Sequence, residues 1–168
     1  EIRQTNLTIN QDLNLDCLNN DSQTEKSYKI PKNGDWVTIS VDNDSVPFIR
    51  TVYGLETEPT VEIRNEQDTE ELTYYYYKDN EQEFFEKWEN NNHSYAVIEN
   101  DVATFLVPVK DRDSIVKTNG NNYSFKSIDD MLEYYHDFVE QFDKFLGLSY
   151  DADNILNKNI RTKFFVKA

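Results

Sequence analysis

The apolar and polar positions in the first half of the chain alternate in short runs. From Asn6 to about Tyr77 these runs are "LTIN", "LNLDCL", "KSYKI", "WVTISV", "VPFIRTVY", "TVEIR" and "ELTYYYY". Turn-forming residues separate them, for example at Asn33-Gly34-Asp35. Alternation places successive side chains on opposite faces, so each run predicts a half-buried β-strand. Short strands at this spacing indicate an antiparallel all-β sandwich or barrel.

The period changes to that of a helix in "DNEQEFFEKWEN", which begins at Asp79. Its two phenylalanines and Trp88 share one helical face, and Asp79 or Asn80 is a suitable N-cap ahead of acidic first-turn residues. After the polar "NNNHS", the pattern returns to strands in "YAVIE" and "ATFLVPV". These two runs predict a hairpin that turns around Asn100-Asp101.

The clearest single element is a helix from Ser127 to Leu146. Ser127 followed by Asp130 resembles a capping box, and Gly147 suits the left-handed position after a helix. Apolar residues recur at intervals of three and four: Ile128, Met131, Leu132, Tyr135, Phe138, Val139, Phe142, Phe145 and Leu146. So wide a stripe predicts packing against a sheet.

The run from Thr162 to Val166, "TKFFV", is β-branched and aromatic. Such a run is typical of a strand that is buried on both faces, and it is a candidate for the sheet beneath the long helix. We expect it to pair with a further strand outside this sequence. When the chain is alone, the strand should then fray or associate with other copies.

Charge narrows the classes of function. The chain has 17 lysines and arginines against 32 aspartates and glutamates, a net charge of −15. This field repels phosphate backbones, so binding to nucleic acid is not expected, and it also disfavours anionic membranes. No apolar window approaches the roughly 20 residues that span a bilayer, so membrane insertion is not expected either. The aromatic content of 14% is too high for a disordered acidic chain.

The sequence offers no complete active site. Its two histidines, His93 and His136, and its single cysteine, Cys17, are too few for a histidine-based zinc site. Cys17 cannot form an internal disulfide and is expected to be a small buried hydrophobe. His136 has Glu133 and Glu140 at neighbouring helical positions, but a solvated acidic face is the better interpretation. There is no GxSxG elbow or phosphate-binding loop, and acid pairs are frequent here by chance.

The tyrosine run from Tyr74 to Tyr77 is the most distinctive candidate for binding. In a strand, Tyr74 and Tyr76 face one side while Tyr75 and Tyr77 face the other, so at least one pair belongs to the core. Exposed tyrosine rings stack on sugar faces while their hydroxyls form hydrogen bonds. We therefore name Tyr74 and Tyr76 as candidate glycan contacts.

Several stretches together resemble one family. "TEKSYKIPKNGDWVTISVDNDSVPFI" is similar to the N-terminal sandwich of the M60-like, or enhancin-like, zinc metallopeptidases, which act on mucins and other glycoproteins. "HSYAVIENDVATFLVPVKDRDSI" and "FKSIDDMLEYYHDFVEQFDKFLGLSYDADN" resemble that family's entry into its catalytic domain. "NKNIRTKFFVKA" is similar to the strand that precedes its substrate cleft. The resemblance runs in order over residues 13–168.

The resemblance implies a mainly β fold with α elements, in two parts. Residues 1–93 would form an antiparallel β-sandwich of immunoglobulin or jelly-roll type. Residues 94–168 would begin an M60-like peptidase domain with the hairpin, the helix 127–146 and the strand 162–166. No HExxH occurs, so no catalytic or metal-binding residue is assigned. This chain should be inactive, and zinc is expected in the full-length protein.

The resemblance also implies partners and a location. The partners would be the remainder of the same polypeptide and glycans or mucin-type glycoproteins, outside the cell or at its surface. Two other hypotheses stay open. One is a stand-alone carbohydrate-binding or adhesive β module, in which the acidic surface and Tyr74 and Tyr76 act. The other is an unrelated enzyme with a carboxylate-only site.

Overall fold

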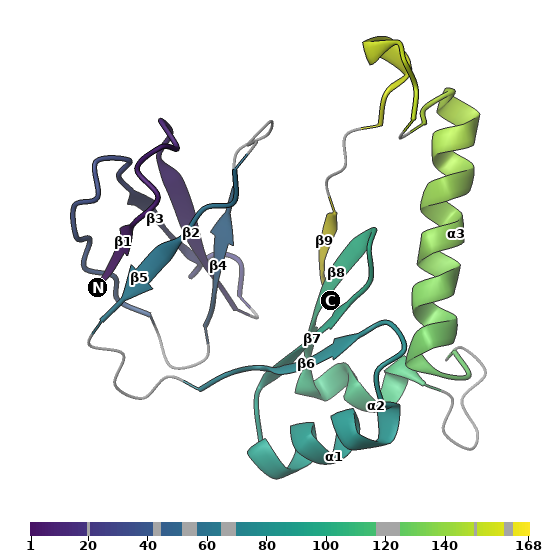
Figure 1. Ribbon diagram of the computed structural model, residues 1–168. Coiled ribbons are helices and arrows are strands. Elements are labelled where there is room, and N and C mark those ends of the chain that lie inside the picture. Colours follow the sequence, from purple (N-terminus) through teal and green to yellow (C-terminus); the bar gives the residue numbers. More distant parts are fainter. Residues whose placement is uncertain are drawn as a thin grey trace. The chain divides into compact units, whose positions relative to one another are not determined.

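The computed structural model describes residues 1–19, 21–41, 45–51, 57–64, 70–116, 125–149, 151–159 and 163–168. The chain forms two compact units, Glu1–Glu70 and Glu71–Ala168, and each is considered by itself. The described strands form three sheets, accompanied by a few helices (Figure 1). The predicted class, mainly β with α elements, is confirmed.

Unit 1 contains two antiparallel sheets. In one, β1 (Ile2–Gln4) pairs with β5 (Val61–Ile63). In the other, β2 (Leu13–Leu18) lies between β3 (Lys26–Ile30) and β4 (Val46–Arg50). Burial alternates along β2, as its sequence predicts. Both sheets contribute to one core, which is made of Ile2, Leu13, Leu15, Cys17 and Ile30.

The predicted strands at β2, β3, β4 and β5 were right, whereas two other predicted runs of unit 1, "LTIN" and "WVTISV", are not strands. "LTIN" forms a turn, whereas Ile2–Gln4, which was not predicted, is a strand. "WVTISV" makes a single bridge, through a pair of 2.9 Å backbone hydrogen bonds between Val37 and Ile2. Cys17 is buried, as expected for a small hydrophobe. The immunoglobulin or jelly-roll topology stays a prediction.

The surface of unit 1 carries a tryptophan flanked by two arginines. The guanidinium carbons of Arg3 and Arg64 lie 4.7 Å and 3.9 Å from the ring centroid of Trp36. Arg3 forms a 2.6 Å ion pair with Glu62, and Arg64 forms one of the same length with Glu1. The aromatic ring is thus covered by charged groups from the same unit.

Unit 2 is built on a mixed sheet in the order β6-β7-β8-β9. The strands are β6 (Thr73–Tyr76), β7 (Tyr95–Glu99), β8 (Ala103–Pro108) and β9 (Phe164–Lys167). β7 and β8 form the predicted antiparallel hairpin, while β6 pairs parallel with β7 and β9 pairs parallel with β8.

The predicted boundary at residue 93 is wrong. Helix α1 (Glu81–Asn91) returns the chain so that β6 pairs parallel with β7, which places β6 and α1 in unit 2. The units therefore divide between Glu70 and Glu71. Strand alternation identifies β6 as a strand but not the sheet that it joins.

The predicted helix in "DNEQEFFEKWEN" is confirmed as α1. The Asn80 side chain accepts a 3.2 Å hydrogen bond from the Glu83 backbone N–H and caps its first turn. Phe84 and Trp88 are buried in the unit 2 core. Short helical turns follow β8, namely η1 (Val109–Asp111) and α2 (Arg112–Ile115), and η2 (Ile155–Asn157) precedes β9.

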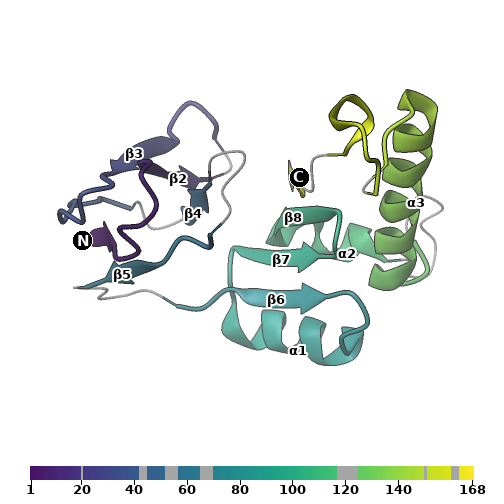
Figure 2. The same ribbon diagram turned by 45° about the horizontal axis from the view of Figure 1, so that its top comes forward.

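The long helix is confirmed as α3 (Ile128–Leu146). Ser127 caps it through a 3.0 Å hydrogen bond from the Asp130 backbone N–H, and Gly147 ends it with a φ of 70°. Its buried residues, Ile128, Met131 and Leu132, all belong to its first half. Figure 2 shows the C-terminal half of α3 continuing past the sheet. Within the described residues, no helix is long and apolar enough to cross a membrane.

The last predicted strand is confirmed with shifted bounds. β9 runs from Phe164 to Lys167 rather than from 162 to 166, and Thr162 lies outside the described residues. The pattern predicts burial on both faces, yet every residue of β9 is exposed in this chain.

Candidate functional site

The tyrosine run is divided between the two faces of β6. Tyr75 is 1% exposed, and its hydroxyl donates a 2.9 Å hydrogen bond to Asp129 at the start of α3. The Tyr77 hydroxyl likewise donates to Glu133, at 2.7 Å. Tyr74 and Tyr76 are 48% and 39% exposed. The pair that sequence reasoning selected as glycan contacts is therefore the accessible pair, while Tyr75 and Tyr77 pack towards α3.

Asp129 holds the tyrosine strand in place. The carboxylate oxygen that accepts from Tyr75 also accepts a 3.0 Å hydrogen bond from the backbone N–H of Lys78. Lys78 has a φ of 73°, a left-handed conformation that costs energy outside glycine and is fixed here by this bond. Sequence reasoning missed Asp129, because its partners lie far away along the chain.

Tyr74 stands beside a shallow pocket of about 250 Å³. The pocket is lined by Tyr74, Asp79, Asn80, Glu83, Phe84 and Lys87. Burial, followed by the neighbouring Glu99 carboxylate, raises the pKa of Tyr74 to about 12, so its hydroxyl remains a donor at neutral pH. The Tyr74 ring can stack on the face of a sugar, while the neighbouring carboxylate, amide and ammonium groups can form hydrogen bonds with its hydroxyls.

Tyr76 stands beside a second pocket, of about 450 Å³. The pocket is lined by Tyr76, Tyr77, Asp101, Leu132, Glu133, His136 and Asp137. On another side of Tyr76, the Lys163 ammonium lies 5.7 Å from the ring centroid and donates to Glu99. Each of the two exposed tyrosines of β6 thus lines a separate pocket.

The histidines do not form a metal centre. The ring nitrogens of His136 lie 3.7 Å from Asp101 and 3.6 Å from Asp137, whereas Glu133 and Glu140 were the expected neighbours. The ring Nδ1 of His93 lies 3.2 Å from the Thr73 hydroxyl, and its backbone carbonyl accepts a 2.9 Å hydrogen bond from the Trp88 indole. Across the part of the chain that the structure describes, no three His, Cys, Asp or Glu side chains are arranged to hold a metal ion. These residues do not fit zinc.

No protein-family model matches the sequence, and no characterised protein matches it by sequence comparison. Solved structures with the same fold include M60 metallopeptidase catalytic domains. The catalytic module of the metalloprotease ZmpA from Clostridium perfringens aligns with a TM-score of 0.67 at 13% identity, over 98% of this chain and 36% of that chain.

Two further structures extend the comparison. The M60 catalytic domain of Clostridium perfringens ZmpC, in complex with the sialyl T antigen, aligns with a TM-score of 0.62 at 13% identity, over 99% of this chain and 36% of that chain. A conserved protein of unknown function from Bacillus anthracis str. Ames aligns with a TM-score of 0.72 at 11% identity, over 99% of this chain and 32% of that chain. This chain therefore spans about a third of the length of these neighbours. At such identities the likeness shows the fold alone.

Proposed function

We propose that this chain is the N-terminal, noncatalytic part of a secreted or cell-surface M60-like metallopeptidase that acts on mucin-type glycoproteins. One observation carries the proposal: the likeness to M60 catalytic domains covers 98% and 99% of this chain, and so includes both units. The stretches of sequence that resemble the family are distributed in the same order over the same units. The partner of this chain is then the remainder of its own polypeptide.

The zinc centre belongs to that remainder. An HExxH helix supplies two zinc-binding histidines and a glutamate that activates water. This sequence has no HExxH, and its two histidines belong to separate polar settings. We therefore expect this chain alone to hold no stoichiometric zinc and to cleave nothing.

The test compares this chain with the polypeptide that its gene encodes up to the stop codon. The longer polypeptide should contain HExxH, bind one zinc per chain and cleave a mucin-type glycoprotein. A chelator, or exchange of the HExxH glutamate for glutamine, should abolish cleavage. A gene that stops close to Ala168, or chelator-sensitive cleavage by this chain alone, would falsify the proposal.

A stand-alone carbohydrate-binding module is the second candidate, favoured by the exposure of Tyr74 and Tyr76, each beside a pocket. On a glycan array, the double variant Tyr74→Ala, Tyr76→Ala should lose binding. Tyr134→Ala, which removes an exposed ring from α3, is the matched control and should retain it. Equal binding by both variants removes this candidate.

A further inference from the structure

The apolar face of α3 is continuous along the helix, but it is covered over only part of its length. Ile128 and Leu146 lie about five helical turns apart, and Met131 and Phe142 about three, so each pair points in nearly the same direction. Ile128 and Met131 are buried in the core. Phe142 and Leu146 are 51% and 50% exposed. The same face is thus buried at one end and open at the other.

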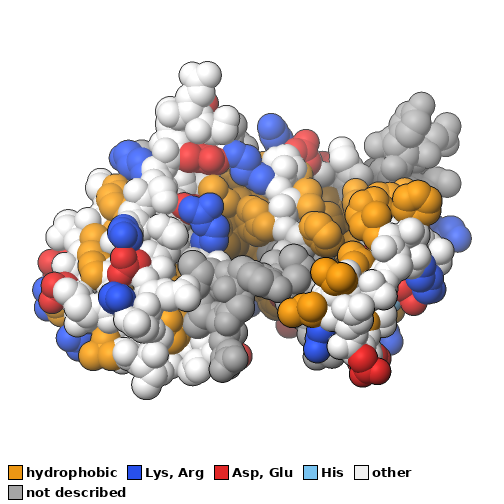
Figure 3. All heavy atoms as spheres, turned by 90° about the horizontal axis from the view of Figure 1, so that it is seen from above, with side chains coloured by type: hydrophobic (Ala, Val, Ile, Leu, Met, Phe, Trp, Pro, Cys, Tyr) orange, Lys and Arg blue, Asp and Glu red, His pale blue; other side chains and the backbone are white. Residues whose placement is uncertain are grey.

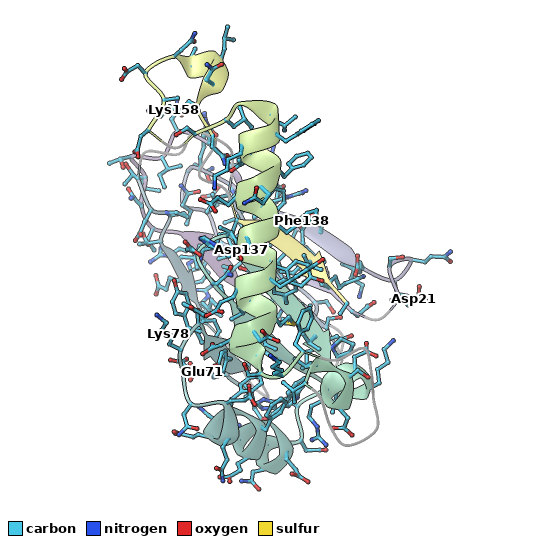
Figure 4. The ribbon with its side chains drawn as sticks, turned by 90° about the vertical axis from the view of Figure 1, so that its right-hand side faces the viewer. Asp21, Glu71, Lys78, Asp137, Phe138 and Lys158 are labelled. Carbon is cyan, nitrogen blue, oxygen red and sulfur yellow. The ribbon has the colours of Figure 1, made fainter. Side chains whose placement is uncertain are left out.

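We call the open part the α3 stripe, and its exposed residues are Tyr134, Phe138, Phe142, Phe145 and Leu146. Figure 4 shows Phe138 projecting from the side of the helix. Figure 3 looks down on this end of α3, where hydrophobic side chains gather. From Tyr134 to Leu146 the helix rises about 18 Å, which is the length of a typical strand.

The sheet adds to this apolar surface. Phe164 and Val166 of β9 pair with Ala103 and Phe105, so they lie on the side of the sheet that faces the core. Both are exposed. Isolated apolar residues are ordinary on a protein surface, but a row of large aromatic residues that continues a core marks an interface.

The charge of the molecule indicates which partner fits. Two copies that each carry a net charge of −15 repel one another, so a second copy is disfavoured. A covalently attached segment avoids that cost of association, because its effective concentration is of millimolar order. The solved structures also favour an attached segment, because the part that matches this chain is only 36% of the ZmpA module and 36% of the ZmpC domain.

We infer that the α3 stripe is the docking surface for a further segment of the same polypeptide. That segment presents an apolar face to Phe138, Phe142 and Phe145 and continues the core of unit 2 along the C-terminal half of α3. The inference rests on the proposed function for the existence of this segment. It does not depend on zinc or on catalysis.

The test places one charge on the stripe in two contexts. In this chain, Phe142→Glu should leave the thermal midpoint nearly unchanged and should weaken any self-association. In the polypeptide encoded to the stop codon, the same change should lower the midpoint by about 5 °C or more, because it buries a charge. The matched control Gln141→Glu adds the same charge at the neighbouring exposed position and should be neutral in both.

Hydrogen exchange of the unmodified proteins guards against a variant that does not fold. Amides of residues 138–146 should exchange at least tenfold more slowly in the longer polypeptide than in this chain. Equal exchange in the two, or an equal effect of Phe142→Glu in the two, overturns the inference. So does a longer polypeptide that still dimerises through the stripe, because a second copy would then be the occupant.

Running these measurements with a chelator present separates the two proposals. A longer polypeptide that binds no zinc and cleaves nothing, yet protects residues 138–146, removes the proposed function and keeps the inference. A zinc-dependent peptidase in which the stripe stays exposed removes the inference and keeps the function.

Discussion

The two units of this chain differ in how far their own residues cover their apolar side chains. In unit 1, the half-buried ring of Trp36 is covered by Arg3 and Arg64, which are themselves paired with carboxylates. Among the described residues of unit 1, the large exposed apolar side chains are Leu7, Val41 and Ile63, which lie far apart in the sequence. In unit 2, the α3 stripe continues the core into solvent.

The difference shows that a unit with a large core can still leave part of its apolar surface uncovered. Unit 2 has the larger apolar core, formed by a sheet and the helices α1, α2 and α3. Unit 1 has the smaller core but supplies the groups that cover its own surface. Unit 1 is therefore expected to be stable by itself, whereas unit 2 is expected to gain stability from what packs on α3.

The largest expected effect separates the two units. Trp88 is fully buried and its indole is hydrogen-bonded, so Trp88→Ala should cost unit 2 about 3–5 kcal/mol. Trp36 is then the only tryptophan left, and its fluorescence reports unit 1 alone during urea unfolding. The urea midpoint of unit 1 should not change. A matching shift of the Trp36 transition would mean that the units unfold as one.

The next effect contrasts the two faces of β6. Tyr75→Ala should cost about 3 kcal/mol or more, because it leaves a cavity and removes the hydrogen bond from the Tyr75 hydroxyl to Asp129. Tyr74→Ala, on the exposed face, should cost less than about 1 kcal/mol. Both can be measured in a Trp36→Phe background, where Trp88 reports unit 2. Equal costs would show that both faces of this strand are buried.

A smaller effect is expected at the hairpin turn. The Asn100 side chain accepts hydrogen bonds from the backbone N–H groups of Val102 and Ala103 and donates to the Leu132 carbonyl, at 2.8–3.0 Å. Asn100→Ala leaves these buried groups unpaired and should cost about 2 kcal/mol. Asn90→Ala, on the exposed face of α1, should be neutral or slightly stabilising. A neutral Asn100→Ala would mean that water replaces these bonds.

The smallest effect is a difference in pH response. The Glu133 carboxylate raises the pKa of Tyr77 to about 12, and burial raises that of Tyr74 to about 12, above the unfolded value of about 10. Folding therefore favours the neutral phenols. Their contribution to the stability of unit 2 is complete below pH of about 10 and is lost as the pH rises towards about 12.

Unit 1 should respond at the opposite end of the scale. The Arg64 side chain lowers the pKa of Glu1, and the Lys29 side chain lowers that of Asp12. This stability is present above the unfolded pKa values and is lost as the pH falls through the lower folded values. Urea midpoints across a pH series check both trends. Tyr77→Phe should reduce the alkaline loss, and an unchanged alkaline loss would contradict the assignment to Tyr77.

The elements that the sequence predicts best are those set by local rules. The periodicity of α1 and α3 and the caps at Asn80, Ser127 and Gly147 depend on residues a few positions apart, and these predictions were confirmed. The unit boundary was missed because the partner of β6 lies beyond a helix. The α3 pattern likewise identifies an apolar face but not the half of it that is covered.

Only part of the candidate site could likewise be predicted from local sequence patterns. Alternation predicts that Tyr74 and Tyr76 share a face, while their exposure follows from the position of the sheet. The polar groups around them come from other elements, such as Glu83 on α1 and Asp101 at the hairpin turn. Pattern alone could not bring these groups together, because each contact joins positions that are remote in sequence.

The parallel pairing of β8 with β9 has a consequence for biosynthesis. Ala103 is paired with Phe164, so the sheet cannot be finished until the whole of α3 has been made. At about 5–20 residues per second, translation from β8 to the end of β9 takes roughly 3–12 s. During that interval the hairpin and α1 can fold on the ribosome while β8 waits for its neighbour. We expect nascent chains stalled before β9 to bind holdase chaperones through the unpaired edge of β8, and this binding should weaken once β9 has emerged and paired with β8.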